Sequence, residues 1–211
     1  MNVHDYQRHG QERRQQEPIF RSLCLTCLQT EVTCYCPYIQ RFDSKIKFVI
    51  LLHPIEARRR IATGRMSYLC LEHSHLIKGQ DYSMNPEVNR IINHPQHYCV
   101  ILFPTQDAMN LSEMTEQERR ERFPQDKQLV VFVIDGTWGT AGITLRQSEN
   151  LQGLPRIGFS PVKPSNFRVR KQPRFGCYAT IEAIHHTIEL IGPGRGFETQ
   201  TGQHDNLIHV F

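Results

Sequence analysis

The sequence predicts an α/β fold built around a mainly parallel sheet. Short apolar runs of strand length alternate along the chain with helical stretches, and two of these runs end at a proline. The runs are apolar at consecutive positions, which is typical of strands covered on both faces, as in a parallel sheet. Strands that alternate with helices indicate parallel pairing with helical crossovers.

The size and composition of the chain allow a packed core. Its 211 residues suffice for one domain, or for one domain with a small appendage. No apolar run approaches the roughly 20 residues that a membrane helix needs, and residues 1–21 lack the apolar centre of a signal peptide. We therefore expect a cytoplasmic protein without a membrane partner. The net charge of +4 is compatible with an RNA partner but does not require one.

Four of the seven cysteines are crowded near the N-terminus, in the pairs Cys24-Leu-Thr-Cys27 and Cys34-Tyr-Cys36. In a cytosolic chain, such crowding favours a metal over disulfides. Four thiolates predict a structural Zn²⁺ site with no open position for catalysis; a redox pair or unliganded thiols are the alternative. We expect a basic arm over 1–21, a zinc module over 22–40 and the main domain over 41–211.

The first half of the main domain contains two predicted strands and three predicted helical segments. The strands cover 47–53, which ends at Pro54, and 98–103, which ends at Pro104. The helical segments cover 55–73, with an interruption near Thr63-Gly64, then 86–93 and 112–122. The last of these is densely charged, which is typical of a solvent-exposed helix.

The second half repeats the alternation. Strands are predicted over 129–134 and 156–159, and helices over 138–150 and 180–191. The last helix places isoleucines on one face, and Gly192-Pro193-Gly194 ends it.

An acid ends the most apolar of these strands. Asp135 follows the run 129–134, and Gly136, Thr137 and Trp138, the only tryptophan of the chain, come next. Open α/β sheets bind small molecules at the carboxyl ends of their strands. The alternative is that Asp135 or Thr137 only caps the following helix.

A second unusual stretch is rich in cations and aromatic residues. Phosphate-binding charges and stackable rings are what an RNA-binding loop needs, and arginine also grips carboxylates through two hydrogen bonds. A solvated basic loop is the alternative. The residues are Phe167, Arg168, Arg170, Lys171, Arg174, Phe175 and Tyr178.

Common enzyme motifs are absent from the sequence. It has no Gly-x-Gly-x-x-Gly turn, no P-loop and no nucleophile elbow, so dinucleotide-binding and common hydrolase functions are disfavoured. Two further polar residues have structural alternatives. His53 can simply end a strand with a satisfied imidazole, and Glu182 can serve the dipole of its helix, worth roughly 0.3–1 kcal/mol.

An ordered set of motifs over about 22–190 resembles the DTW-domain family of tRNA-uridine aminocarboxypropyltransferases. Two positions depart from the usual pattern: Gly136 is inserted in the Asp-Thr-Trp motif, and Ala179 replaces a serine. In chain order, the motifs are Cys24-x2-Cys27, Cys34-x-Cys36, His53-Pro-x-Glu56, Thr63-Gly64, Phe103-Pro104, Asp135-Gly-Thr-Trp138, Ser165-x2-Arg168-x-Arg170-Lys-x-Pro173 and Thr180-x-Glu182-Ala183.

The resemblance makes 41–211 the catalytic domain and implies a SPOUT-like fold with a knotted C-terminal part that binds S-adenosylmethionine. It also implies transfer of the 3-amino-3-carboxypropyl group of that co-substrate to N3 of a uridine in tRNA, with release of 5′-methylthioadenosine. Because N3 lies on the Watson–Crick edge, the base must be unstacked and presented to the enzyme.

The resemblance also assigns roles to residues. Asp135 is the acid beside the reaction, as the base or as an orienting group, since a free aspartate with a pKa of about 3.9 is a poor base at neutral pH. Trp138 walls the co-substrate pocket, and the cations contact tRNA phosphate or the carboxylate of the co-substrate. The assigned residues are Leu102, Phe103, Pro104, Thr105, Trp138 and Thr180 for the co-substrate, and Arg168, Arg170, Lys171 and Arg174 for the anion, with His53, Glu56, Thr63, Thr137 and Glu182 as further motif residues.

Two other functions remain open at this point. One is an RNA methyltransferase of SPOUT type that uses the same co-substrate, and the other is a zinc-containing RNA-binding protein without catalysis. The sequence defines neither the target uridine nor the oligomeric state.

Overall fold

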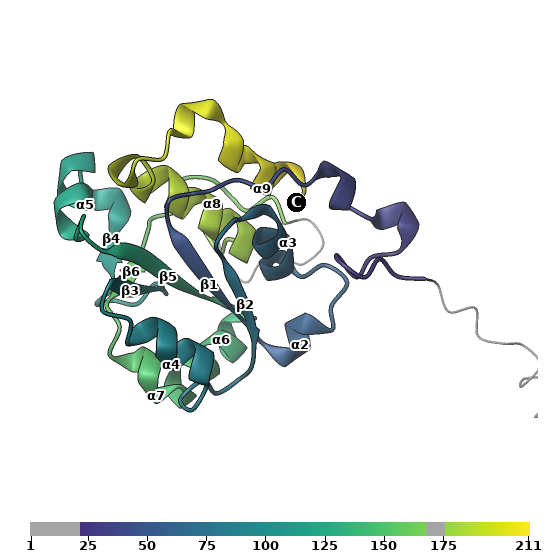
Figure 1. The fold of residues 1–211 in the computed structure, drawn as a ribbon, viewed down its shortest axis with the longest axis horizontal. Helices are drawn as coiled ribbons and strands as arrows, with labels where there is room; N and C mark the ends of the chain where they lie inside the picture. The colour runs from purple at the N-terminus through teal and green to yellow at the C-terminus, as the bar shows by residue number, and fades with distance from the viewer. Residues whose placement is uncertain (1–21, 168–175) are drawn as a thin grey trace, which may run out of the picture. The chain divides into compact units, whose positions relative to one another are not determined.

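The computed structural model describes residues 22–167 and 176–211 (Figure 1). The chain divides into two compact units, Met1–Cys34 and Tyr35–Phe211. Within the first unit, an antiparallel bridge between Leu23 and Thr30 precedes the 3-10 turn η1 (Glu31–Thr33). The second unit carries the α/β fold.

The second unit is organised around a six-stranded sheet in which every pairing is parallel. The strand order is β2-β1-β5-β3-β6-β4, so the first and fifth strands along the chain are neighbours at the centre. The strands are β1 (Lys47–Leu52), β2 (His75–Lys78), β3 (His97–Leu102), β4 (Met109–Asn110), β5 (Gln128–Asp135) and β6 (Arg156–Gly158).

Helices connect the strands and cover both faces of the sheet. They are α2 (Pro54–Ala57), α3 (Thr63–Cys70), α4 (Pro86–Ile92), α5 (Glu116–Arg122), α6 (Trp138–Gln147), α7 (Glu149–Gln152), α8 (Thr180–Ile191) and α9 (Asn206–His209). Short 3-10 turns are η2 (Cys36–Tyr38), η3 (Leu111–Glu113), η4 (Pro193–Arg195), η5 (Thr199–Thr201) and η6 (Gln203–Asp205).

The helices form one layer on each side of the sheet (Figure 1). Helices α4, α6 and α7 cover one face, where Val130, Phe132 and Ile134 of β5 join the buried core. Helices α3, α8 and α9 cover the other face. Because side chains alternate along a strand, the odd-numbered residues of β5, Asp135 among them, point toward α3 and α8.

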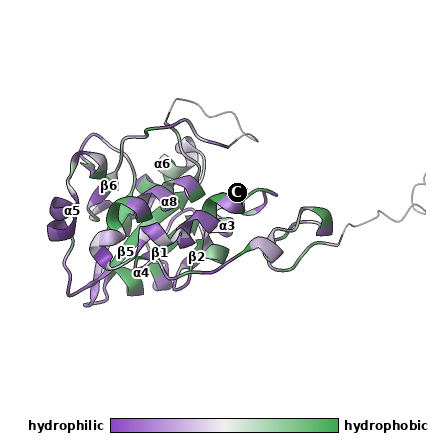
Figure 2. Ribbon diagram, turned by 90° about the horizontal axis from the view of Figure 1, so that it is seen from above, coloured by the Kyte–Doolittle hydropathy of each residue, from purple (hydrophilic) through white to green (hydrophobic). Residues whose placement is uncertain are grey.

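The predicted α/β class and mainly parallel sheet are confirmed. Helix α8 has its predicted bounds, and Gly192 caps it. Helix α5 has no buried residue and is hydrophilic along its length (Figure 2), as its charge density predicted. The knot and the SPOUT-like connectivity stay predictions.

Other elements differ from the prediction. The helical segment over 55–73 is two helices, α2 and α3, and the helix over 138–150 is divided at Ser148 between α6 and α7. The edge strands β2 and β4 were missed. Among the described residues, no helix is long and apolar enough to cross a membrane.

Candidate active site

Asp135 ends the central strand β5 and is buried, with 4% of its surface exposed. The hydroxyls of Thr63 and Thr180 donate hydrogen bonds to its Oδ1, and the Gly64 N–H donates to its Oδ2 over 3.2 Å. Thr63 and Thr180 are the first residues of α3 and α8. The carboxylate therefore lies at two helix N-termini, where donor groups and helix dipoles stabilise negative charge.

The close approach of α3 to Asp135 requires a glycine. A Cβ atom on Gly64 would lie 2.6 Å from Asp135 Oδ2 and 2.9 Å from Ile50 Cγ2, both shorter than real contacts. Any side chain at this position would therefore displace the carboxylate or the strand β1 beneath it.

The residues after Asp135 turn the chain into α6. The Thr137 side chain accepts a hydrogen bond from Thr140 N–H over 3.2 Å and caps this helix. A Cβ atom on Gly136 would lie 2.7 Å from Thr140 Oγ1, so a side chain at the inserted position of the motif would displace that hydroxyl. Thr137 is thus the helix cap that the sequence allowed, whereas Asp135 faces α3 and α8.

A cavity of about 290 Å³ opens at the carboxyl ends of β3, β5 and β6. Its wall is mainly apolar, and Thr180 connects it to Asp135 through the hydrogen bond described above. The lining includes five of the six residues assigned to the co-substrate, namely Leu102, Phe103, Pro104, Trp138 and Thr180. Thr105 is not among the lining residues.

Aromatic pairs form two parts of the cavity wall. Trp138, which is 43% exposed, meets Phe103 edge to face with ring centroids 6.3 Å apart. Phe159 and Tyr178 have ring centroids 5.6 Å apart. Aromatic rings can stack on a flat base, and their faces attract cations. The cavity therefore suits a ligand that combines a heterocycle with positive charge.

Sequence reasoning missed part of this wall. Ala141 lies one helical turn after Trp138, and Phe159 follows the end of β6 at the same edge of the sheet. Helical spacing and strand ends are signals that could have found both residues.

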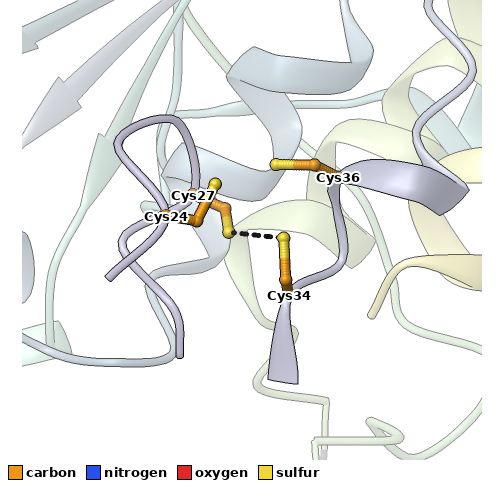
Figure 3. Close-up of side chains that lie close together, drawn as sticks. All are labelled: Cys24, Cys27, Cys34 and Cys36. Atoms are coloured by element: carbon orange, nitrogen blue, oxygen red, sulfur yellow. Dashed lines mark hydrogen bonds between the residues drawn. The ribbon is translucent and has the colours of Figure 1, made fainter. Parts of the chain in front are cut away.

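The four N-terminal cysteines are gathered in space (Figure 3). Their sulfur atoms all lie within 4.8 Å of one another, with 3.6 Å between Cys27 Sγ and Cys34 Sγ. Four sulfurs at about 2.3 Å from a tetrahedral Zn²⁺ would be about 3.8 Å apart. The donor set and its spacing therefore fit a zinc ion. The residues are Cys24, Cys27, Cys34 and Cys36.

A comparison with known families identifies the fold around this site. Residues 21–211 match the DTW domain. The chain belongs to the DTW-domain family. It is also 28% identical over 181 residues to tRNA-uridine aminocarboxypropyltransferase 2 of Drosophila melanogaster. The aligned region covers 82% of this chain and 68% of the Drosophila protein. No solved structure matches the chain.

Glu182 of the DTW domain ties a loop to the start of α8. Its carboxylate accepts hydrogen bonds from Ser165 Oγ at 2.6 Å, from Asn166 N–H at 2.7 Å and from Ala179 N–H at 2.8 Å. The sequence suggested only that Glu182 interacts with the dipole of its helix. These hydrogen bonds do more, because they also fix residues 165–166, just before the basic segment. Ala179 itself offers no side-chain acceptor to the helix.

The His53 and Glu56 motif residues of the DTW domain are buried in and around α2. His53 Nδ1 accepts a hydrogen bond from Ile55 N–H, and the His53 N–H donates to the carbonyl of Asp135 over 3.0 Å. Glu56 Oε2 lies 3.2 Å from Nε of Arg59. His53 therefore caps α2 through Nδ1, and its backbone N–H fixes the chain beside Asp135.

The predicted anion-binding residues lie outside the described residues, and so does the N-terminal arm. The segment 168–175 contains Arg168, Arg170, Lys171 and Arg174. The residues on either side of it are placed: Ser165 contacts Glu182, and Gly176, Cys177 and Tyr178 line the cavity.

Proposed function

We propose that this DTW-domain protein is a tRNA-uridine aminocarboxypropyltransferase that uses S-adenosylmethionine. The observation that carries the proposal is the buried Asp135 carboxylate beside an aromatic-lined cavity at the carboxyl edge of the sheet. Membership of the family and the name of the Drosophila relative support the same function. The cytoplasmic location expected from the sequence is part of this proposal.

The proposed reaction forms a bond between N3 of uridine and the terminal carbon of the aminocarboxypropyl group. When bound, the co-substrate supplies a sulfonium that activates this carbon; the carbon–sulfur bond breaks and its electron pair stays on sulfur, which leaves 5′-methylthioadenosine. Three carbons are attached to the sulfur, so orientation in the cavity selects the transferred group. Trp138 and Phe103 would hold the heterocycle and the positive charge.

We consider two roles for Asp135 in this reaction. As a base, it would accept the N3 proton of the uracil; as a positioning residue, it would hold the starts of α3 and α8 at the cavity, and the N3 proton would pass to water. Its contacts with Thr63, Gly64 and Thr180 support the positioning role, because these donors stabilise the carboxylate as an anion. The variant Asp135→Asn separates the two roles. If Asp135 only positions the helices, the pH dependence of the residual turnover stays unchanged; if Asp135 is the base, its loss removes one limb of the pH–rate profile.

We further propose that the basic segment binds an anionic group and that the cysteine cluster holds Zn²⁺. The described residues around the segment support this proposal: Glu182 fixes Asn166 before it, and Gly176, which follows it, lines the cavity. Binding of tRNA and of S-adenosylmethionine to Arg168→Ala tells the two ligands apart: weakened tRNA binding with a reduced salt dependence indicates a phosphate contact, and weakened co-substrate binding indicates its carboxylate. Unchanged binding of both would make the segment a solvated loop.

Nucleoside mass spectrometry tests the reaction. The purified protein is incubated with unmodified tRNA and S-adenosylmethionine, and the tRNA is digested. Aminocarboxypropyl-uridine together with methylthioadenosine is the expected result. A methylated nucleoside with S-adenosylhomocysteine would instead make the protein a methyltransferase. Binding of tRNA without any product, from a panel of tRNAs, would favour the non-catalytic RNA-binding protein.

A further inference from the structure

A second group of metal-ligand side chains lies where α8 meets η6. His185 is on α8, and His204 and Asp205 belong to η6. One ligand atom from each of the three lies within 4.8 Å of the others. His185 Nε2 is 2.9 Å from Asp205 Oδ1, and the two imidazole rings are stacked at an angle of 17° with centroids 4.6 Å apart.

His204 is the anomalous member of this group. Its side chain is only 3% exposed, yet neither ring nitrogen has a hydrogen-bond partner among the residues that the structure describes. The neighbouring acidic oxygens, on Glu189 and Asp205, lie 3.9 and 4.0 Å from Nε2, too far for a hydrogen bond. An unsatisfied buried polar group costs about 1–3 kcal/mol, so this imidazole calls for a partner that the described side chains do not supply in this arrangement.

The geometry points to a binding site for a divalent transition-metal ion, such as Zn²⁺, formed by His185, His204 and Asp205. Two imidazole nitrogens and a carboxylate oxygen are a donor set that such ions prefer. Glu189 lies one helical turn after His185, with Oε2 3.9 Å from His185 Nδ1, and its carboxylate is within reach as a further ligand.

The distance between two of the ligand atoms fits this assignment. Because the two imidazole planes are nearly parallel, one ring has to turn before both in-plane lone pairs can face the same ion. Two ligand atoms at about 2.1 Å from one ion are about 3–3.4 Å apart, and His185 Nε2 and Asp205 Oδ1 are already close to that spacing. The side chain of Asp205 is 51% exposed and that of Glu189 45%, so both can rotate toward the buried His204.

An ion at this site would fasten the C-terminal segment to α8. That segment continues through α9 to Phe211, whose ring centroid is 5.4 Å from that of Phe167. At its other end, α8 begins with Thr180, whose hydroxyl donates a hydrogen bond to Asp135. The proposed ion is therefore structural, and it is distinct from the zinc of the cysteine cluster.

Metal titration of the full-length protein tests the site. The cysteine cluster is first saturated with Zn²⁺, excess metal is removed, and the protein is titrated with Zn²⁺ by calorimetry and with Co²⁺ by visible absorption. We expect one further ion per chain and weak Co²⁺ bands without thiolate charge transfer. His185→Gln and Asp205→Asn should each lose this ion, whereas His94→Gln, which alters an exposed histidine elsewhere, should keep it.

Two results would overturn the proposal. One is a wild-type protein that binds only the ion of the cysteine cluster. The other is a further ion that persists in both His185→Gln and Asp205→Asn. Circular dichroism and the melting temperature of each metal-free variant show whether it is folded. Added Zn²⁺ should raise the melting temperature of the wild type and of His94→Gln beyond its value with the cysteine cluster filled, but not that of His185→Gln or Asp205→Asn.

Discussion

The Thr180 hydroxyl donates a hydrogen bond to Oδ1 of Asp135 and so joins the first residue of α8 to the last residue of β5. The pair sets the position of the helix that forms one side of the cavity, because Thr180 and Ala183 both line it. A single hydroxyl thus couples the buried acid to the proposed binding site.

Replacement of this hydroxyl should reduce turnover more than stability. Thr180→Val keeps the shape of the side chain and removes one donor from a buried carboxylate, at a cost of about 1–3 kcal/mol in unfolding free energy. We expect kcat/KM to fall at least tenfold. The control is Thr187→Val, which removes another buried hydroxyl of α8, one that donates to the Ala183 carbonyl. Equal activity of the two variants would contradict the coupling.

A methyl group at residue 64, on α3, should displace the Asp135 carboxylate. In Gly64→Ala, the new Cβ would lie 2.6 Å from Asp135 Oδ2, and overpacking of this kind costs typically about 1–3 kcal/mol. We expect lower stability in urea unfolding and a loss of turnover. Gly153→Ala is the control, since a Cβ there meets nothing within 4 Å and should leave both measurements nearly unchanged.

The single tryptophan provides a direct probe of the cavity. Because Trp138 lines the cavity and is partly exposed, S-adenosylmethionine should change its fluorescence on binding. Trp138→Ala should weaken co-substrate binding and raise KM with little effect on stability, and Trp138→Phe should restore part of the affinity. Ile143→Ala, at a partly exposed position on the same helix, is the control. Fluorescence that stays constant while calorimetry records binding would place the co-substrate elsewhere.

The cysteines should fall into reactivity classes. Burial raises the pKa of Cys70 to about 12 and that of Cys99 to about 11, so both thiols stay protonated and resist iodoacetamide at pH 8 in the folded protein. The thiols of the cysteine cluster should be alkylated only after a chelator removes the zinc. Peptide mass spectrometry of the native, chelated and unfolded protein measures each class.

The raised pKa values of Cys70 and Cys99 also make the stability of the fold depend on pH. An unfolded thiol loses its proton near pH 8.5, whereas Cys70 and Cys99 hold theirs to higher pH when folded. The unfolded state therefore binds fewer protons above that pH, and the contribution of these thiols to stability falls as the pH rises. Urea midpoints of the double variant Cys70→Ala, Cys99→Ala should decline less between pH 8 and 10 than those of the wild type.

Strands with both faces covered could be predicted, and edge strands could not. The central strands β1, β3 and β5 are apolar at successive positions because helices cover both of their faces. The edge strand β2 includes the polar residues His75 and Lys78 and is only partly buried, so it has no such pattern. The order of the strands depends on pairings between distant segments, about which local sequence says nothing.

The site was predictable where its residues follow strand ends or begin helices. Asp135 and Trp138 come directly after an apolar run, and Thr180 opens an amphipathic helix. The role of Gly64 as the close neighbour of Asp135 depends on how α3 approaches β5, which only the structure provides. The pairing of His185 with His204 likewise arises from a chain reversal after α8.

The central pairing of the sheet has a consequence for how the protein folds. Lys47 of β1 pairs with Val130 of β5, more than 80 residues later in the chain. Contacts of such high sequence separation slow folding, because the entropy of closing the intervening loop is lost before the contact forms. During synthesis, β1 therefore has to wait for β5 to be translated, and until then β2 can pair only with its opposite edge.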